Sequence, residues 1–135
     1  LKERGFTDMS YKGGGPTGNF RYLIASAFGK DLSAFDPNAA RLGHIVLTAD
    51  SYFKVLDVFN IGDKTQVVLL NIPAHAVEFF EKASTNIEED IAKKARLRFE
   101  QLIDAAPVEE LQSPEWLKRT SLPIGMNQKG EMFYP

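Results

Sequence analysis

The pattern that most constrains the fold lies in residues 52–72. Two runs rich in β-branched and aromatic residues, Tyr52–Asn60 and Thr65–Ile72, flank the dipeptide Gly62-Asp63. Such runs form strands, and a short glycine-containing turn between them closes an antiparallel hairpin. We therefore predict a β-hairpin at the centre of the fold, preceded by a strand over His44–Ala49.

This turn also predicts which residues of the hairpin pair: Phe59 with Gln66, Val58 with Val67, Asp57 with Val68, Leu56 with Leu69 and Val55 with Leu70. One face then carries Leu56, Val58, Val67 and Leu69, an apolar core set. The opposite face carries Phe53, Val55, Phe59, Val68 and Leu70, with Asp57 and Gln66 among them. A sheet with one face in water does not need two apolar faces, so we expect something to cover the second one.

Residues 20–28 fit two patterns. Phe20, Leu23, Ile24, Ala27 and Phe28 follow the spacing of an amphipathic helix, with Gly29 where a C-terminal cap would lie. The same segment alternates as a strand would, through Phe20, Tyr22 and Ile24. The helix is the interpretation we favour, and the strand remains open.

The other segments predict mostly helix after residue 72. Residues 1–19 form an irregular lead, and Asp36-Pro37 starts a short helical turn that ends near Leu42. The helical segments begin at Pro73, at the capping box Thr85–Glu88 and at Ser113-Pro114, and residues 122–134 suggest a terminal hairpin. We therefore predict one α+β domain over residues 1–135, with an antiparallel sheet of three to five strands and C-terminal helices on one face.

Composition excludes several kinds of chemistry. The chain has no cysteine and two histidines, His44 and His75, so thiol nucleophiles, disulfides, iron–sulfur clusters and zinc–thiolate sites are excluded. The net charge of −2 does not favour a nucleic-acid or membrane partner. No signal-peptide or membrane-spanning pattern is visible, and we expect a cytoplasmic protein that uses no cofactor.

Three motifs are each better explained as structure. The glycine cluster Gly13–Gly18 lacks the preceding strand and the Lys-Ser/Thr pair of a phosphate-binding P-loop, so we interpret it as a mobile or backbone-close loop. His44 and His75 lie 31 positions apart and match no metal motif, so no metal site is predicted. The charged run over residues 88–98 matches the helix dipole and i, i+4 pairing, which indicates a solvated helix face.

Asp57 is the strongest candidate for a chemical role. It lies in mid-strand between Val55 and Phe59, where an unpaired carboxylate would be costly. One interpretation is a pocket acid with a raised pKa. The other, which we favour, is a carboxylate paired with a lysine or arginine from a neighbouring element.

What covers the second face of the hairpin separates three hypotheses. The first is a non-catalytic protein-interaction module, such as a stoichiometric inhibitor or immunity-like protein, whose exposed patch consists of Tyr52, Phe53, Lys54, Val55, Asp57, Phe59 and Val68. The second is a small-ligand-binding protein or enzyme with an apolar cavity over the sheet and Asp57 as polar anchor. In the third, residues 17–42 cover the face and function lies elsewhere. No catalytic residue is predicted.

Overall fold

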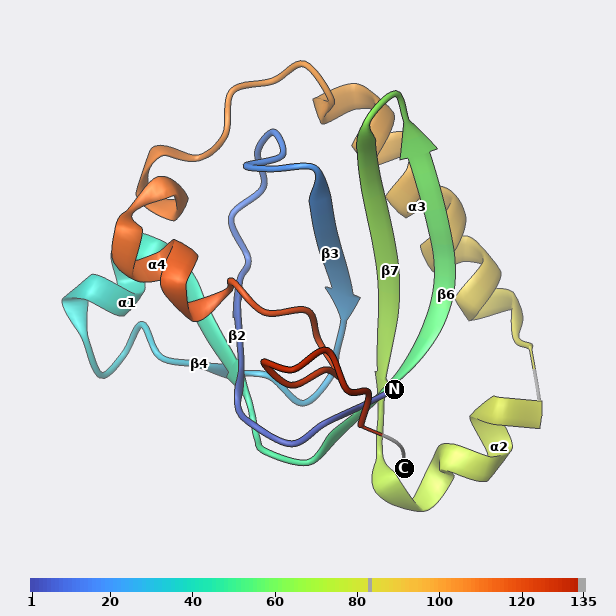
Figure 1. The fold of residues 1–135 in the computed structure, drawn as a ribbon. Helices are drawn as coiled ribbons and strands as arrows, with labels where there is room; N and C mark the ends of the chain where they lie inside the picture. Colours follow the sequence, from blue (N-terminus) through green and yellow to red (C-terminus); the bar gives the residue numbers. More distant parts are fainter. Residues whose placement is uncertain (83, 134–135) are drawn as a thin grey trace.

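The computed structural model describes residues 1–82 and 84–133. Within them seven strands form two sheets, accompanied by four α-helices and two 3-10 helices. The strands are β1 (Lys2–Glu3), β2 (Thr7–Ser10), β3 (Phe20–Ala25), β4 (Lys30–Asp31), β5 (His44–Leu47), β6 (Ser51–Ile61) and β7 (Lys64–Ile72). The helices are α1 (Pro37–Leu42), η1 (Ala74–Ala76), α2 (Val77–Lys82), α3 (Asn86–Leu102), η2 (Glu109–Gln112) and α4 (Pro114–Arg119). The predicted mixture of helix and strand is confirmed (Figure 1).

The larger sheet, which we call sheet A, has the strand order β1-β6-β7-β3. Its β6–β7 hairpin turns at Gly62, which adopts a left-handed conformation with φ 59°, so the predicted hairpin is confirmed. β3 pairs with β7 in parallel, so the sheet is mixed and the prediction of an antiparallel sheet is wrong.

The helical interpretation of residues 20–28 is also wrong, because Phe20–Ala25 is a strand. The free edge of β7 accepts this segment and places Tyr22 beside Val67 and Ile24 beside Leu69. The period-2 pattern therefore describes the segment, since pairing with a strand more than 40 positions later in the chain supplies its hydrogen bonds.

A β-bulge at Leu56 changes the second half of the hairpin register. The predicted pairs of Phe59, Val58 and Asp57 are confirmed, but Val55 pairs with Leu69 and not with Leu70. The extra residue on β6 moves every side chain before it to the opposite face. Phe53 and Val55 therefore share a face with Leu69 and not with Val68.

The smaller sheet, sheet B, is antiparallel with the order β2-β5-β4. The lead over residues 1–19 is thus not wholly irregular, because β1 joins the edge of β6 and β2 pairs with β5. Leu47 of β5 packs with Phe53 and Leu69 in the central core cluster, with Met9 and Ile24 against it. Sheet B therefore covers part of one face of sheet A.

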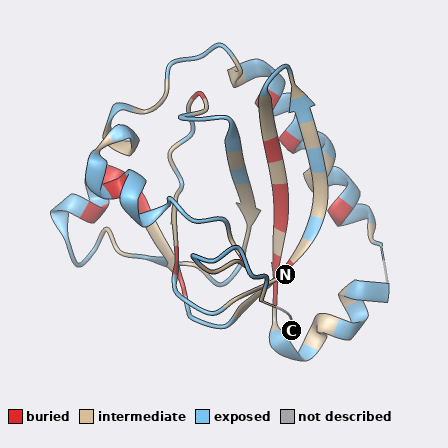
Figure 2. Cartoon of the chain, in the orientation of Figure 1, coloured by how far each residue is buried: buried red, intermediate tan, exposed pale blue. Residues whose placement is uncertain are grey.

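The helix α3 contacts the other face of sheet A. Its capping box forms as predicted, with Thr85 Oγ1 accepting from the backbone N–H of Glu88 and the Glu88 carboxylate accepting from the N–H of Thr85. The buried amide of Gln66 donates from Nε2 to the carbonyl of Ala95 at 3.0 Å. Figure 1 shows α3 running alongside β6 and β7, and Figure 2 shows the many buried positions of β7.

The remaining helical predictions fit with adjusted boundaries. The turn at Asp36-Pro37 forms α1 and ends at Leu42, while Ser113 caps α4 as its pattern predicts. The segment from Pro73 begins as the 3-10 helix η1 before α2. The predicted terminal hairpin over 122–134 is a single bridge between Met126 and Met132, and position 134 lies outside the described residues.

Candidate functional site

Asp57 is paired with an arginine. Both of its oxygens accept from Arg96 of α3, at 2.6 Å from Nε and 2.7 Å from Nη2, and its side chain is 13% exposed. The hydrogen bonds from Arg96 lower the pKa of Asp57 and outweigh burial, which acts to raise it. The structure thus shows the ion pair that the sequence favoured, and the interpretation of Asp57 as an acid with a raised pKa is wrong.

A second ion pair joins the same two elements. Lys54 of β6 lies 2.6 Å from a carboxylate oxygen of Glu88, which is buried at the start of α3. Burial raises the pKa of Glu88, but hydrogen bonds from Lys54 and Thr85 lower it by more, so the net shift is downward. The charged residues of β6 therefore attach α3 to the sheet.

The predicted contact patch is largely covered. Phe53 is 2% exposed in the core beside Leu47, and Val68 is fully buried on the α3 face. Phe59 packs edge-on against Phe99 of α3 at 6.3 Å. The helix α3, and not residues 17–42, covers the face that carries Asp57, so the exposure expected of Phe53 and Val68 is not found.

The other three predicted binding residues lie together. Tyr52, Lys54 and Val55 line a shallow cavity of about 270 Å³, together with Leu1, Phe53, Ile72, Val77 and Glu81. The cavity lies where the N-terminus and α2 meet β6.

The exposed apolar surface lies on the opposite side of sheet A from α3. We call it the open face and define it by Phe20, Tyr22, Val55 and Val58, which are all exposed or close to it. Phe20 is 73% exposed and Val58 is 54% exposed. Strand register places Tyr22, Val67 and Val58 in one row across three strands. Sheet B packs over Leu69 and Phe53, and Val67 packs against the same core cluster, but Tyr22 and Val58 at the two ends of the row remain exposed.

The side chains that β3, β6 and β7 place on the same side of sheet A as the open face include no charged residue. By register they include Phe20, Tyr22, Ile24, Val55, Val58, Asn60, Thr65, Val67 and Leu69. Charged residues make up 25% of the whole chain. The sequence assigned Val58, Val67 and Leu69 to the core: Leu69 belongs to the core cluster and Val67 packs against it, whereas Val58 is exposed. The strand pattern in Phe20–Ile24 was the signal that could have revealed this surface.

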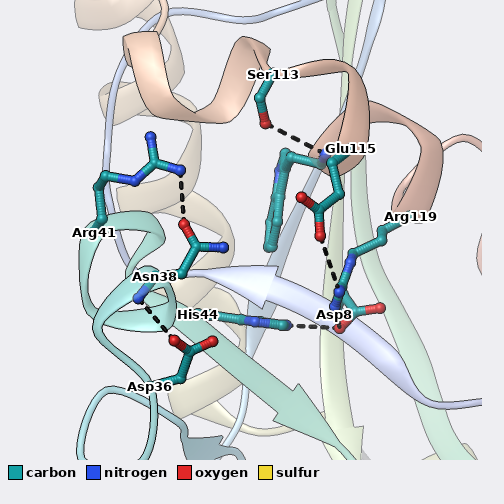
Figure 3. A network of polar contacts seen from close by, with 9 residues as sticks. Asp8, Asp36, Asn38, Arg41, His44, Ser113, Glu115 and Arg119 are labelled. Atoms are coloured by element: carbon teal, nitrogen blue, oxygen red, sulfur yellow. Dashed lines mark hydrogen bonds and ion pairs between the residues drawn. The ribbon is translucent and has the colours of Figure 1, made fainter.

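A polar network surrounds His44 of β5 (Figure 3). The ring Nε2 of His44 lies 2.6 Å from Asp8, and Trp116 packs edge-on against the ring at 5.2 Å. Arg119 of α4 bridges Asp8 at 3.9 Å and Glu115 at 3.3 Å. Through these contacts β2, β5 and α4 meet at one buried histidine.

The chemistry of this network is limited. His44, Glu115 and Arg119 border a cavity of about 180 Å³. The nearest hydroxyl by register, that of Ser10 opposite His44, donates to the carbonyl of Leu42 at 2.6 Å and is committed to structure. His75 lies exposed in η1 and takes no part in this network. No group of three metal-ligating side chains occurs in the described part of the chain.

The glycine cluster is held close to the end of α3. The N–H of Gly15 donates to the carbonyl of Ala106 at 3.1 Å, and a Cβ on Gly15 would lie 1.8 Å from the carbonyl oxygen of Ala105. Only glycine fits such an approach of two backbones. Of the two expected roles, the backbone-close loop is therefore the one observed.

Comparison with protein families, with curated proteins and with solved structures finds no match to this chain. Among the helices of residues 1–82 and 84–133, none has the length and apolar character to cross a membrane. The function is consequently argued from the geometry of this molecule.

Proposed function

We propose that this protein is a non-catalytic protein-interaction module, of the kind that acts as a stoichiometric inhibitor or an immunity-like protein. The observation that supports the proposal is the open face, where Phe20, Tyr22, Val55 and Val58 are exposed on an uncharged side of sheet A. Large exposed apolar patches are uncommon on monomeric proteins and mark contact surfaces when they occur.

The chemistry of the open face specifies the partner surface. A charged group buried against Val58 and Tyr22 would lose its hydration without gaining a counter-charge. The centre of the partner surface is therefore apolar and uncharged. Tyr22 and Phe20 are aromatic anchors of the type that contributes most to binding in such interfaces.

The contact surface extends toward the residues first chosen from the sequence. Val55 belongs to the open face and also lines the cavity beside Tyr52 and Lys54. Tyr52 and Lys54 lie on the α3 side of β6 by register, so they border the cavity and not the open face. Phe53 and Val68 are buried. A cytoplasmic location is part of the same proposal, supported by the absence of cysteine.

The alternative is a small-ligand-binding protein with Asp57 as its polar anchor, and the geometry supports it less. Both carboxylate oxygens of Asp57 already accept hydrogen bonds from Arg96, so they are not free to bind a ligand. The two cavities described above, of about 270 and 180 Å³, fall below the ~300–1,000 Å³ that is usual for small-molecule sites.

Quantitative capture from the native host tests the proposal. Val58→Glu places a charge at the centre of the open face, and Leu97→Glu makes the same change at an exposed leucine of α3. We expect wild type and Leu97→Glu to retain one protein in a 1:1 ratio and Val58→Glu to lose it. Equal capture by Val58→Glu, or a small molecule retained in the native mass spectrum without a protein partner, would contradict the proposal.

A further inference from the structure

Two arginines from different elements meet beside the glycine cluster. Arg21 of β3 donates from Nη1 to the carbonyl of Gly14 at 2.8 Å. The Nη2 of Arg98 on α3 lies 3.8 Å from the position that a Cβ would occupy on Gly13. Both guanidinium groups therefore border the same short stretch of backbone.

Neither arginine has a carboxylate partner among the described residues, whereas Arg96 and Arg119 both do. On the same segment, Lys12 is paired with Glu110 at 3.8 Å, so that carboxylate is already engaged. Burial lowers the pKa of Arg21, and the positive charge of Arg98 lowers it further. The partly buried Arg21 is repelled by the exposed Arg98, and a bound anion would reduce this cost.

The backbone next to the arginines supplies further donors. In the described residues the N–H groups of Gly13 and Gly14 donate to no protein acceptor, while the N–H of Gly15 is held by Ala106. Backbone N–H groups that lack a protein acceptor can donate to phosphate oxygens. Unlike a P-loop, this arrangement takes its positive charge from two guanidinium groups and uses no lysine within the motif.

We propose that Arg21, Arg98 and the backbone of Gly13–Gly14 bind a phosphate group, either inorganic phosphate or that of a small phosphomonoester. Guanidinium groups bind phosphate oxygens through paired charge-assisted hydrogen bonds, and two of them match the double charge of a phosphate better than that of a single carboxylate. The site lies on the edge of sheet A beside the end of α3 and is independent of the open face.

Nitrogen-15 NMR at constant ionic strength tests this site with three probes: inorganic phosphate, phenyl phosphate and acetate. We expect saturable shifts of the Gly13 and Gly14 amide signals with phosphate, and weaker shifts with acetate. Arg98→Gln removes one exposed guanidinium and is expected to weaken phosphate binding about tenfold. Lys93→Gln, which removes an exposed cation on the same helix, is the matched control and should leave the affinity unchanged.

The probes also distinguish the source of the phosphate. Tighter binding of phenyl phosphate than of inorganic phosphate identifies a phosphomonoester as the ligand, and the reverse order identifies the free ion. Shifts that do not saturate, equal binding by Arg98→Gln, or an equal loss in Lys93→Gln would overturn the proposal. The folded state of each variant is read from the dispersion of the same spectra.

Discussion

The two faces of sheet A differ in a way that polarity alone does not predict. The face under α3 includes Arg21, Lys54, Asp57 and Gln66, and it is the covered one. The face opposite α3 carries Phe20, Tyr22 and Val58 and is partly bare. The more polar face is buried because α3 brings the partners that its charges need, Arg96 for Asp57 and Glu88 for Lys54.

This difference separates stability from recognition. Charged pairs between β6 and α3 fix where the helix lies, while Phe99 and Val68 supply the apolar burial beneath it. The open face has no comparable cover and contributes little to folding. Substitutions on the covered face should therefore change stability, and those on the open face should change binding.

The largest effect is expected from Val68→Glu. Val68 is fully buried, so a carboxylate there would be desolvated without a partner and the variant should not fold. The matched change Val58→Glu lies on the opposite face of the same hairpin and should alter the free energy of unfolding by less than about 1 kcal/mol. Circular dichroism with urea denaturation measures both. A folded Val68→Glu protein, or an unfolded Val58→Glu protein, would break the comparison.

Removing a phenylalanine ring from each face of sheet A compares how much the two faces contribute to the free energy of unfolding. Phe99 is fully buried against Phe59, so Phe99→Ala should lower the free energy of unfolding by about 3–5 kcal/mol. Phe20→Ala removes the same ring from the open face and should cost less than about 1 kcal/mol. Phe99→Leu, with a smaller loss, gives a measurable value if Phe99→Ala is unfolded. Equal losses at positions 99 and 20 would contradict the assignment.

Gly15→Ala tests the close packing of the glycine loop against residues 105–106, which follow α3. Its Cβ would overlap the carbonyl of Ala105, so one of the two backbones must move, at a cost of about 1–3 kcal/mol. Gly18→Ala is the control, because nothing lies within 4 Å of its Cβ position. Thermal unfolding should separate the two variants by several degrees. The same melting temperature for both would show that the loop is not packed closely against residues 105–108.

Asp57→Asn should have the smallest effect, visible in its dependence on pH. The pKa of Asp57 is lowered in the folded state, so the ion pair contributes fully above the ordinary carboxyl pKa of about 4. That contribution is lost as the pH falls through the lower pKa of the folded protein. We expect the variant to melt a few degrees below wild type near neutral pH, and the difference to shrink in acid. A difference that stays constant with pH would show that the ion pair does not stabilise the fold.

Prediction from sequence succeeded where the signal was local. The hairpin turn at Gly62, the cap of α3 at Thr85 and the start of α1 at Asp36 each depend on neighbouring residues, and each is found. The prediction that Asp57 pairs with a basic residue also held, because an isolated carboxylate in a strand flanked by Val55 and Phe59 is costly.

Prediction failed where a distant segment decided the outcome. The bulge at Leu56 shifts Phe53 and Val55 to the face of Leu69, and the sequence of the hairpin contains no pattern that predicts this shift. The strand β3 forms because the edge of β7 is free to pair, although its own residues fit a helix as well. The face that the sequence assigned to the core is consequently divided, with Leu69 buried in the core and Val58 exposed.

By itself, the sequence determined that the chain is a mixed α+β protein with a central hairpin, a capped helix after it and no thiol chemistry. Those properties follow from residue type and from spacing over a few positions. Only the tertiary structure decided that α3 covers the face of Asp57, that β3 joins in parallel and that Val58 and Phe20 remain exposed. Such choices depend on contacts between segments far apart in the chain, where packing and charge pairing outweigh local preference.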